Sequence, residues 1–223
     1  MEKMNRDEFC KLHWSYYLVL EKDFLDTERY ISFEFGDNYL YDSHQVIDYG
    51  NSNTFSNEFV KQYQAICSEI DVILKSICKE LGNTVANEMP QYTDLVLNQW
   101  SHLPDQKVKM KDIELQPLKN WSSNLVYKSP DWWKPYNCVK HERLENFRKA
   151  NLKNVTNALA GLYILELYFV KFIGDRDSDM DVPNDVSKIF ELVDFQTNDK
   201  VIGYESYSIR TQTIASLFEN EQQ

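Results

Sequence analysis

An apolar stripe between residues 56 and 81 constrains the fold more than any other feature of the sequence. Its apolar side chains recur at steps of three and four residues, which is the spacing of one face of an α-helix. The members of the stripe are Phe59, Tyr63, Ile66, Cys67, Ile70, Ile73, Leu74, Ile77, Cys78 and Leu81. Thr54 or Ser56 can cap the start of this helix, and Gly82 stands where a left-handed residue ends one. A long helix with one broad apolar face needs other helices to cover that face.

Two further segments follow the same period. One runs from about residue 6 to residue 31, and a last long helix is expected from Pro130 or Pro135 to about Ile173. Proline fits only the first turn of a helix, so Pro135 marks either its true start or a kink. Glycine and proline number only six each, and 43 % of the 223 residues are apolar. These values predict one mainly α domain over residues 1–223, folded as a helical bundle.

Shorter elements are expected in the rest of the chain. Alternating polar and apolar residues predict a small β-hairpin excursion over residues 107–115. The other predicted pieces are an extended piece near residues 39–41, a helix over 84–88 or 92–100, a helix over 186–193 and an extended piece over 200–209.

Four aspartates alternate after the last long helix, namely Asp175, Asp177, Asp179 and Asp181. The alternation is similar to that of a calcium loop, but Met180 stands where such a loop needs glycine and Val186 where it needs glutamate. A solvated acidic loop is therefore expected, with short elements over the remainder of residues 174–223.

The cysteines and the chain start indicate the compartment. No two of the four cysteines form a C-x-x-C pair, so we expect reduced and mostly buried thiols without a metal cluster at Cys10, Cys67, Cys78 and Cys138. The first eight residues are charged and do not form a signal peptide. The most apolar window, residues 158–173, is short for a bilayer and is interrupted by Glu166 and Lys171. These features predict a cytoplasmic protein with no membrane segment and no cofactor.

Charge is distributed unevenly along the chain. The formal net charge of −11 argues against a protein that covers nucleic acid or an anionic membrane with its whole surface. Residues 107–153 nevertheless hold eleven lysines and arginines against five acidic residues, a local balance of +6. This basic segment predicts local contact with a polyanion such as RNA or a nucleotide. Protection of strand edges and helix faces against aggregation is an equally open explanation.

One part of the basic segment combines aromatic, basic and amide side chains. On a continuous helix, Asn137, His141 and Arg148 share the face that becomes apolar further along the chain. Lys140 and Arg143 lie on the flanks of that face. Histidine gives and takes protons near neutral pH, and neighbouring cations can hold a phosphate. These residues therefore predict a phosphate-handling site, with Arg148 as a binding residue and His141, Asn137, Lys140 and Arg143 as candidate catalytic residues.

A structural role for the same residues stays open. Polar groups on a buried face need partners, because an unpaired one costs about 1–3 kcal/mol. His141 and Asn137 would then be hydrogen-bonded in a helix–helix or dimer interface, with Trp132 and Trp133 packed below them.

The run from Trp132 to Arg143 reads W-W-x-x-Y-N-x-x-K-H-x-R. This signature resembles that of a group of uncharacterised bacterial proteins, and residues 53–59 and 67–75 fit the same likeness. Through them the chain resembles the HEPN superfamily, whose fold is a helical bundle with a polar motif at the start of its last long helix. The resemblance implies a homodimer and a metal-independent ribonuclease, of the kind found in antiphage (antiviral) defence and in toxin–antitoxin systems.

The motif of that superfamily is an arginine, often followed by a polar residue, and then a histidine. His141 matches the histidine and Asn137 the polar residue, while Tyr136 stands at the position of the arginine. A tyrosine cannot hold a phosphate as a bidentate guanidinium does, so Lys140 or Arg143 would have to supply the charge.

Two functions follow from these residues and this resemblance. The first is a HEPN-like protein that binds RNA or a nucleotide, with Tyr136, Arg148, Trp132 and Trp133 as binding residues and His141 as the general acid or base. The second is a catalytically silent module of a bacterial defence system that binds another protein. Its anchors would be the exposed aromatic side chains of Trp121, Trp132 and Trp133.

Overall fold

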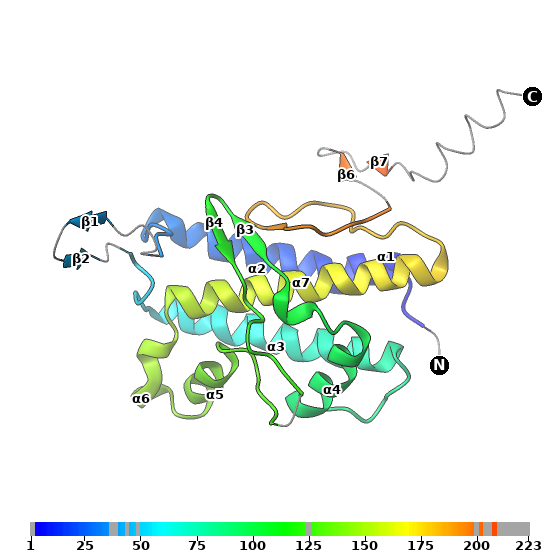
Figure 1. The fold of residues 1–223 in the computed structure, drawn as a ribbon, viewed down its shortest axis with the longest axis horizontal. Coiled ribbons are helices and arrows are strands. Elements are labelled where there is room, and N and C mark those ends of the chain that lie inside the picture. Colours follow the sequence, from blue (N-terminus) through cyan, green and yellow to red (C-terminus); the bar gives the residue numbers. More distant parts are fainter. Residues whose placement is uncertain are drawn as a thin grey trace, which may run out of the picture.

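Two long helices, α3 (Asn57–Glu80) and α7 (Leu152–Asp177), pack side by side at the centre of the molecule (Figure 1). The structure is a computed structural model that describes residues 3–35, 40–42, 45–47, 50–123, 126–198, 201–202 and 207–208. The N-terminal helices lie along the same pair and complete the bundle. The predicted mainly α fold with a small β-hairpin is confirmed.

Helix α3 matches the prediction within one residue at each end. The Ser56 side chain accepts a hydrogen bond from the Phe59 backbone N–H at 3.0 Å, which caps the helix start. Gly82 follows the helix with φ +91°, a conformation that favours glycine because it has no Cβ. Most of the predicted apolar stripe is buried.

The N-terminal helical segment is interrupted where the sequence predicts a continuous helix. It consists of α1 (Arg6–Phe9), a π-helical turn η1 (Cys10–Trp14), α2 (Ser15–Asp26) and a 3-10 turn η2 (Thr27–Arg29). The overall extent agrees with the prediction, but the π turn was not predicted.

The predicted last long helix is wrong in its extent. The chain forms α5 (Trp133–His141), α6 (Arg143–Asn146), a 3-10 turn η4 (Phe147–Lys149) and then α7. Glu142 has φ −136° and ψ 55°, outside the helical region, and it separates α5 from α6. A new helix begins at α7 because the Asn151 side chain accepts from the Asn154 N–H at 3.0 Å.

The β structure is small. Strands β3 (Val108–Met110) and β4 (Ile113–Leu115) form the predicted hairpin, with Lys111 at φ +55° in the turn. The short strand β5 (Glu191–Leu192) pairs with the other edge of β3, so the helix predicted over 186–193 is wrong. Short two-stranded pieces complete the β structure: β1 (Leu40–Asp42), β2 (Gln45–Ile47), β6 (Val201–Ile202) and β7 (Tyr207–Ser208). Residues 40–41 of the extended piece predicted near 39–41 are extended, as are residues 201–202 and 207–208 of the piece predicted over 200–209. The other residues of both predicted pieces lie outside the described residues.

Helix α4 (Met89–Gln99) occupies the region where a helix was expected over 84–88 or 92–100. Pro90 lies in its first turn and starts the helix rather than dividing it, since a first-turn residue needs no N–H donor. A 3-10 turn η3 (Leu103–Asp105) follows.

The acidic segment departs from the expected solvated loop. Helix α7 continues through Asp177 and ends before Ser178, which has φ +55°. Asp181 is buried, and it accepts hydrogen bonds from Lys171 Nζ at 3.0 Å and from the Asn198 backbone N–H at 2.7 Å. The prediction is therefore wrong for Asp181. Within the described ranges, no group of three His, Cys, Asp or Glu side chains could hold a metal ion.

Helix α7 is long and apolar enough to cross a membrane by length and composition alone, but 78 % of its most apolar window is buried inside the bundle. This burial is typical of a core helix. The thiols of Cys10, Cys67 and Cys78 are buried as predicted, whereas Cys138 is half-buried, and none of the four forms a disulfide.

Candidate nucleic-acid interface

Trp132 attaches the start of α5 to the bundle. Its indole Nε1 donates to the Pro117 carbonyl at 2.8 Å, and the Tyr63 hydroxyl donates to the Trp132 carbonyl. The ring also lies close to Gly161 of α7, where an added Cβ would meet Trp132 Cζ2 at 3.0 Å. Trp132 therefore belongs to the core and positions the residues that follow it.

The prediction of exposed tryptophan anchors is wrong for two of the three side chains. Trp121 and Trp132 are each only 2 % exposed. Trp121 Nε1 donates to Thr93 Oγ1 at 2.7 Å, so its polar group is satisfied inside the protein. Trp133 is half-buried and keeps part of its ring at the surface.

The Tyr136 side chain packs α5 against α3. Its ring contacts the rings of Tyr63 and Trp133, with centroids 5.8 and 5.2 Å away. Burial, with a smaller contribution from Cys67, raises the pKa of Tyr136 to about 12. Lys140 Nζ lies 5.7 Å from the ring centroid, a cation–π distance. Tyr136 is only 5 % exposed and therefore presents little surface to a ligand, which contradicts its prediction as a binding residue.

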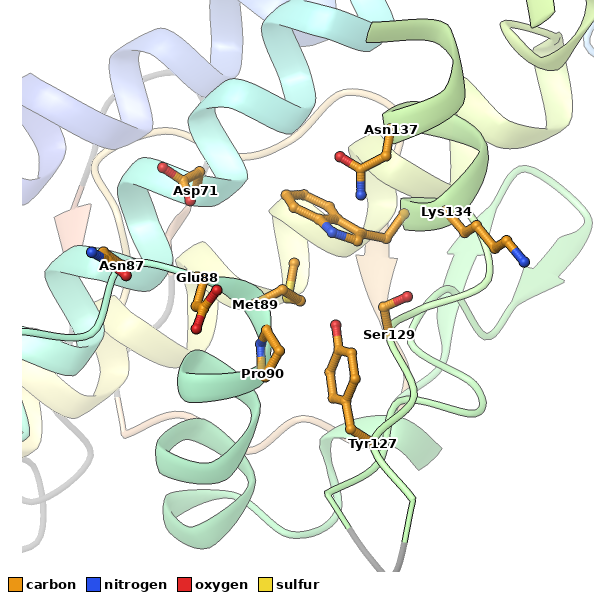
Figure 2. Close-up of a pocket in the computed structure, with 10 residues that line it drawn as sticks. Asp71, Asn87, Glu88, Met89, Pro90, Tyr127, Ser129, Lys134 and Asn137 are labelled. Carbon is orange, nitrogen blue, oxygen red and sulfur yellow. The ribbon is translucent and has the colours of Figure 1, made fainter. Parts of the chain in front are cut away.

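Asn137, Lys134 and Trp133 line one wall of a cleft of about 470 Å³ (Figure 2). The volume lies within the range of roughly 300–1,000 Å³ that is typical of small-molecule sites. The opposite wall is the start of α4, and the cleft is also lined by residues 127 and 129 and by α3. These other lining residues are Asp71, Asn87, Glu88, Met89, Pro90, Tyr127 and Ser129.

The polar groups of the cleft differ in their availability. Both carboxylate oxygens of Asp71 are engaged, one by the Tyr92 hydroxyl at 3.0 Å and the other by Lys75 Nζ at 2.5 Å. Burial and the adjacent Asp71 raise the pKa of Tyr92. Neither the Glu88 carboxylate nor the Asn137 amide has a hydrogen-bond partner among the described residues. These two side chains are available to a ligand.

The elements from α5 to the start of α7 lie at one end of the bundle (Figure 1), and they carry a set of exposed basic side chains. We call this set the basic end, and it consists of Lys134, Lys140, His141, Arg143, Arg148, Lys149 and Lys153. None of them forms an ion pair with any residue that the structure describes. The acidic residues within the same stretch are Glu142 and Glu145. Arg148 lies over the Phe55 ring, with its Cζ 5.4 Å from the centroid.

The structure brings only part of the predicted site together. Asn137 and His141 lie one turn apart on the same side of α5, as the helical spacing predicts. The break at Glu142 separates them from Arg143 and Arg148, so the single face predicted for Asn137, His141 and Arg148 does not exist. His141 is exposed rather than part of a buried face.

The second wall of the cleft was missed by the sequence analysis. Glu88 and Met89 precede Asn137 by almost fifty residues, and no periodicity links them to α5. The one local signal in the sequence is Pro90, because proline is common in the first turn of a helix and so indicates a helix start.

Comparisons of the chain with family models, with curated proteins and with solved structures gave no match. The HEPN resemblance of residues 132–143 stays a prediction.

Proposed function

We propose that this protein binds single-stranded RNA at its basic end, with His141 as the proton-transfer group of a metal-independent cleavage. The observation that carries the proposal is the basic end itself, where exposed cations gather without acidic partners among the described residues. Some exposed lysines elsewhere are paired, as in Lys22 with Asp26 and Lys61 with Glu58, whereas others such as Lys11 and Lys109 are unpaired among the described residues but do not gather at one place on the chain. Cations left without internal partners are those available to phosphates.

The charge distribution supports local rather than general contact with RNA. Residues 133–153 hold six lysines and arginines against two glutamates, in a chain whose net charge is −11. RNA would be attracted to this end and repelled by the rest of the surface. Affinity for RNA should therefore fall steeply as salt is added.

The order of side chains on α5 supports single-stranded rather than double-stranded RNA as the ligand. Lys134, Asn137 and His141 follow one another at helical spacing along one side of α5, from the cleft toward the end of the helix. Trp133 and Tyr127 line the cleft beside them and can stack on an unpaired base.

The chemistry assigned to His141 needs no metal. In this step His141 accepts the proton of a ribose 2′-hydroxyl, and the 2′-oxygen attacks the adjacent phosphorus. The P–O5′ bond breaks, the protonated His141 gives its proton to the leaving 5′-oxygen, and a 2′,3′-cyclic phosphate remains. Lys140 precedes His141 and Arg143 follows the helix break, so either cation can stabilise the developing negative charge. A role in antiphage defence or in a toxin–antitoxin pair, and a homodimeric state, stay predictions of the HEPN resemblance.

The test is incubation of the protein with mixed-sequence single-stranded RNA in EDTA, scored for 2′,3′-cyclic phosphate ends. The wild type should cleave, and His141→Ala should lose at least about 100-fold in rate. Thermal unfolding of both proteins serves as the folding control. Absence of cleavage by folded wild-type protein at any RNA concentration would overturn the enzymatic part, and absence of binding would overturn the whole proposal.

One observation favours a second candidate function, the binding of an acidic protein. Leu144 lies within the basic end and is 93 % exposed, and a protein partner would bury it. Binding of such a partner should weaken on Leu144→Ser, whereas RNA binding should be unaffected by that substitution and should depend more steeply on salt.

A further inference from the structure

We infer that the cleft between α4 and α5 recognises a guanine base, an inference that rests on the proposed RNA-binding function and specifies its ligand. The basic end can hold phosphates of any sequence, because phosphates carry no sequence information. Selectivity must come from side chains that meet the edge of a base. The cleft adjoins the basic end through Lys134 and Asn137 and holds such side chains.

The two walls of the cleft offer opposite hydrogen-bonding groups. Figure 2 shows the Asn137 amide turned toward the cleft, while the Lys134 side chain extends away from it. Glu88 comes from the start of α4, on the other wall. A base within the cleft would therefore meet a carboxylate on one side and an amide on the other, with a cation outside to meet its phosphate.

The carboxylate favours guanine among the four RNA bases. Guanine alone presents two adjacent donors, N1–H and the N2 amine, in the plane of one edge, and both can donate to the two oxygens of Glu88. Adenine and cytosine place an acceptor beside their amino group, and uracil has a single N–H between two carbonyls. Each would leave a carboxylate oxygen opposed to an acceptor, which is unfavourable.

The rest of the cleft suits the same base. The Asn137 amide can donate to guanine O6 or N7, which are acceptors. Trp133 is half-buried and Tyr127 is 39 % exposed, so both rings keep surface on which a purine can stack. Asp71 does not compete for the base, because Tyr92 and Lys75 already occupy its oxygens.

The test compares oligouridylates that carry one guanine, one inosine or one adenine at the same internal position, measured by fluorescence anisotropy at fixed salt. The guanine oligomer should bind wild-type protein about tenfold more tightly than the adenine oligomer. Inosine keeps N1–H but lacks the N2 amine, so its affinity should be intermediate. Competition with GMP and AMP distinguishes a base within RNA from a free nucleotide.

Two variants isolate the role of Glu88. Glu88→Gln should abolish the preference for guanine, because the amide replaces one of the two acceptor oxygens with an NH₂ group that opposes a guanine donor. Glu145→Gln makes the same chemical change at an exposed carboxylate of α6 outside the cleft and should keep the preference.

The outcomes separate the two proposals. Equal wild-type affinity for all oligomers overturns the guanine inference and leaves RNA binding standing. Binding of GMP but of no oligomer supports a guanine site and overturns the RNA function. A guanine preference that survives Glu88→Gln overturns the assignment of the base to Glu88.

Discussion

Two histidines of this protein stand in opposite surroundings. His13 is 4 % exposed, its Nδ1 lies 3.0 Å from Glu69 Oε1, and the rings of Phe9 and Phe169 flank it. The side chain of His141 is exposed and has no hydrogen bond or ion pair with any described residue. A histidine paired with a carboxylate in a core stabilises the fold, whereas an exposed one among cations is available to a ligand. The partners of a histidine therefore indicate its role better than its presence in a motif.

The largest predicted effect is the difference in stability between the alanine variants of these two histidines. His13→Ala leaves the buried Glu69 carboxylate without its hydrogen-bond partner in the core, so the free energy of unfolding should fall by about 3 kcal/mol. His141→Ala should change it by less than about 0.5 kcal/mol, since nothing in the described structure depends on that side chain. Urea unfolding of both variants measures the difference. Equal losses of stability in the two variants would mean that His13 and His141 do not differ in their structural roles.

The same buried region should make stability depend on pH. Glu166 is fully buried, neither of its carboxylate oxygens has a hydrogen-bond partner among the residues that the structure describes, and burial, reinforced by Glu69, raises the pKa of Glu166 well above its ordinary value. The folded state therefore keeps a proton that the unfolded chain releases above about pH 4.5. The resulting stabilisation is present below that pH and is lost as the pH rises, at up to about 1.4 kcal/mol per pH unit for this group.

Glu166→Gln tests this dependence. The amide does not titrate, so stability should fall less between pH 5 and pH 8 in the variant than in the wild type. Urea unfolding at several pH values measures the two slopes. Asp94→Gln, a carboxylate change on the exposed side of α4, serves as a control and should keep the wild-type slope. Parallel slopes for the wild type and Glu166→Gln would show that Glu166 does not carry the dependence.

A third substitution tests how the core positions the basic end. Gly161→Ala would place a Cβ 3.0 Å from Trp132 Cζ2, and the ring cannot move easily because Pro117 and Tyr63 hold its residue. Such overpacking costs about 1–3 kcal/mol and exceeds the helix-forming gain of alanine over glycine, about 1 kcal/mol. We expect a net loss of about 1 kcal/mol in thermal or urea unfolding.

A double-mutant cycle gives that prediction its control. Trp132→Phe removes the ring atom that the new methyl group meets, so Gly161→Ala should cost less in that background. An unchanged cost would show that the contact with Trp132 is not the cause.

These contrasts explain how much of the fold could be predicted from the sequence. The extent of α3 follows from local signals, namely an apolar period, a serine cap and Gly82. The break between α5 and α7 depends on distant contacts, since Asn151 pairs with Phe55 in a β-bridge and the Leu152 N–H donates to the Thr54 carbonyl at 2.9 Å. A helical wheel assumes continuity, so it could not separate Arg148 from Asn137.

The candidate site shows the same limit. The side of α5 that carries Asn137 and His141 is a local property and was predicted. The cleft needs Glu88 and Tyr127 from other parts of the chain, and the core pair joins His13 to Glu69 across 56 residues. Tertiary contacts of this kind leave no periodic signal in a single sequence.

The smallest effect should come from a single cation of the basic end. Arg148 is exposed and lies over Phe55, so Arg148→Ala should cost less than about 1 kcal/mol of stability. If Arg148 contacts a phosphate, the variant should bind RNA a few-fold more weakly and with a salt dependence reduced by about one counterion. Lys22→Ala is the matched control, because Lys22 is exposed on α2, away from the basic end, and is paired with Asp26. Anisotropy titrations at several salt concentrations should therefore give a shallower slope for Arg148→Ala alone. A shallower slope for Lys22→Ala as well would mean that the whole surface, rather than the basic end, contacts RNA.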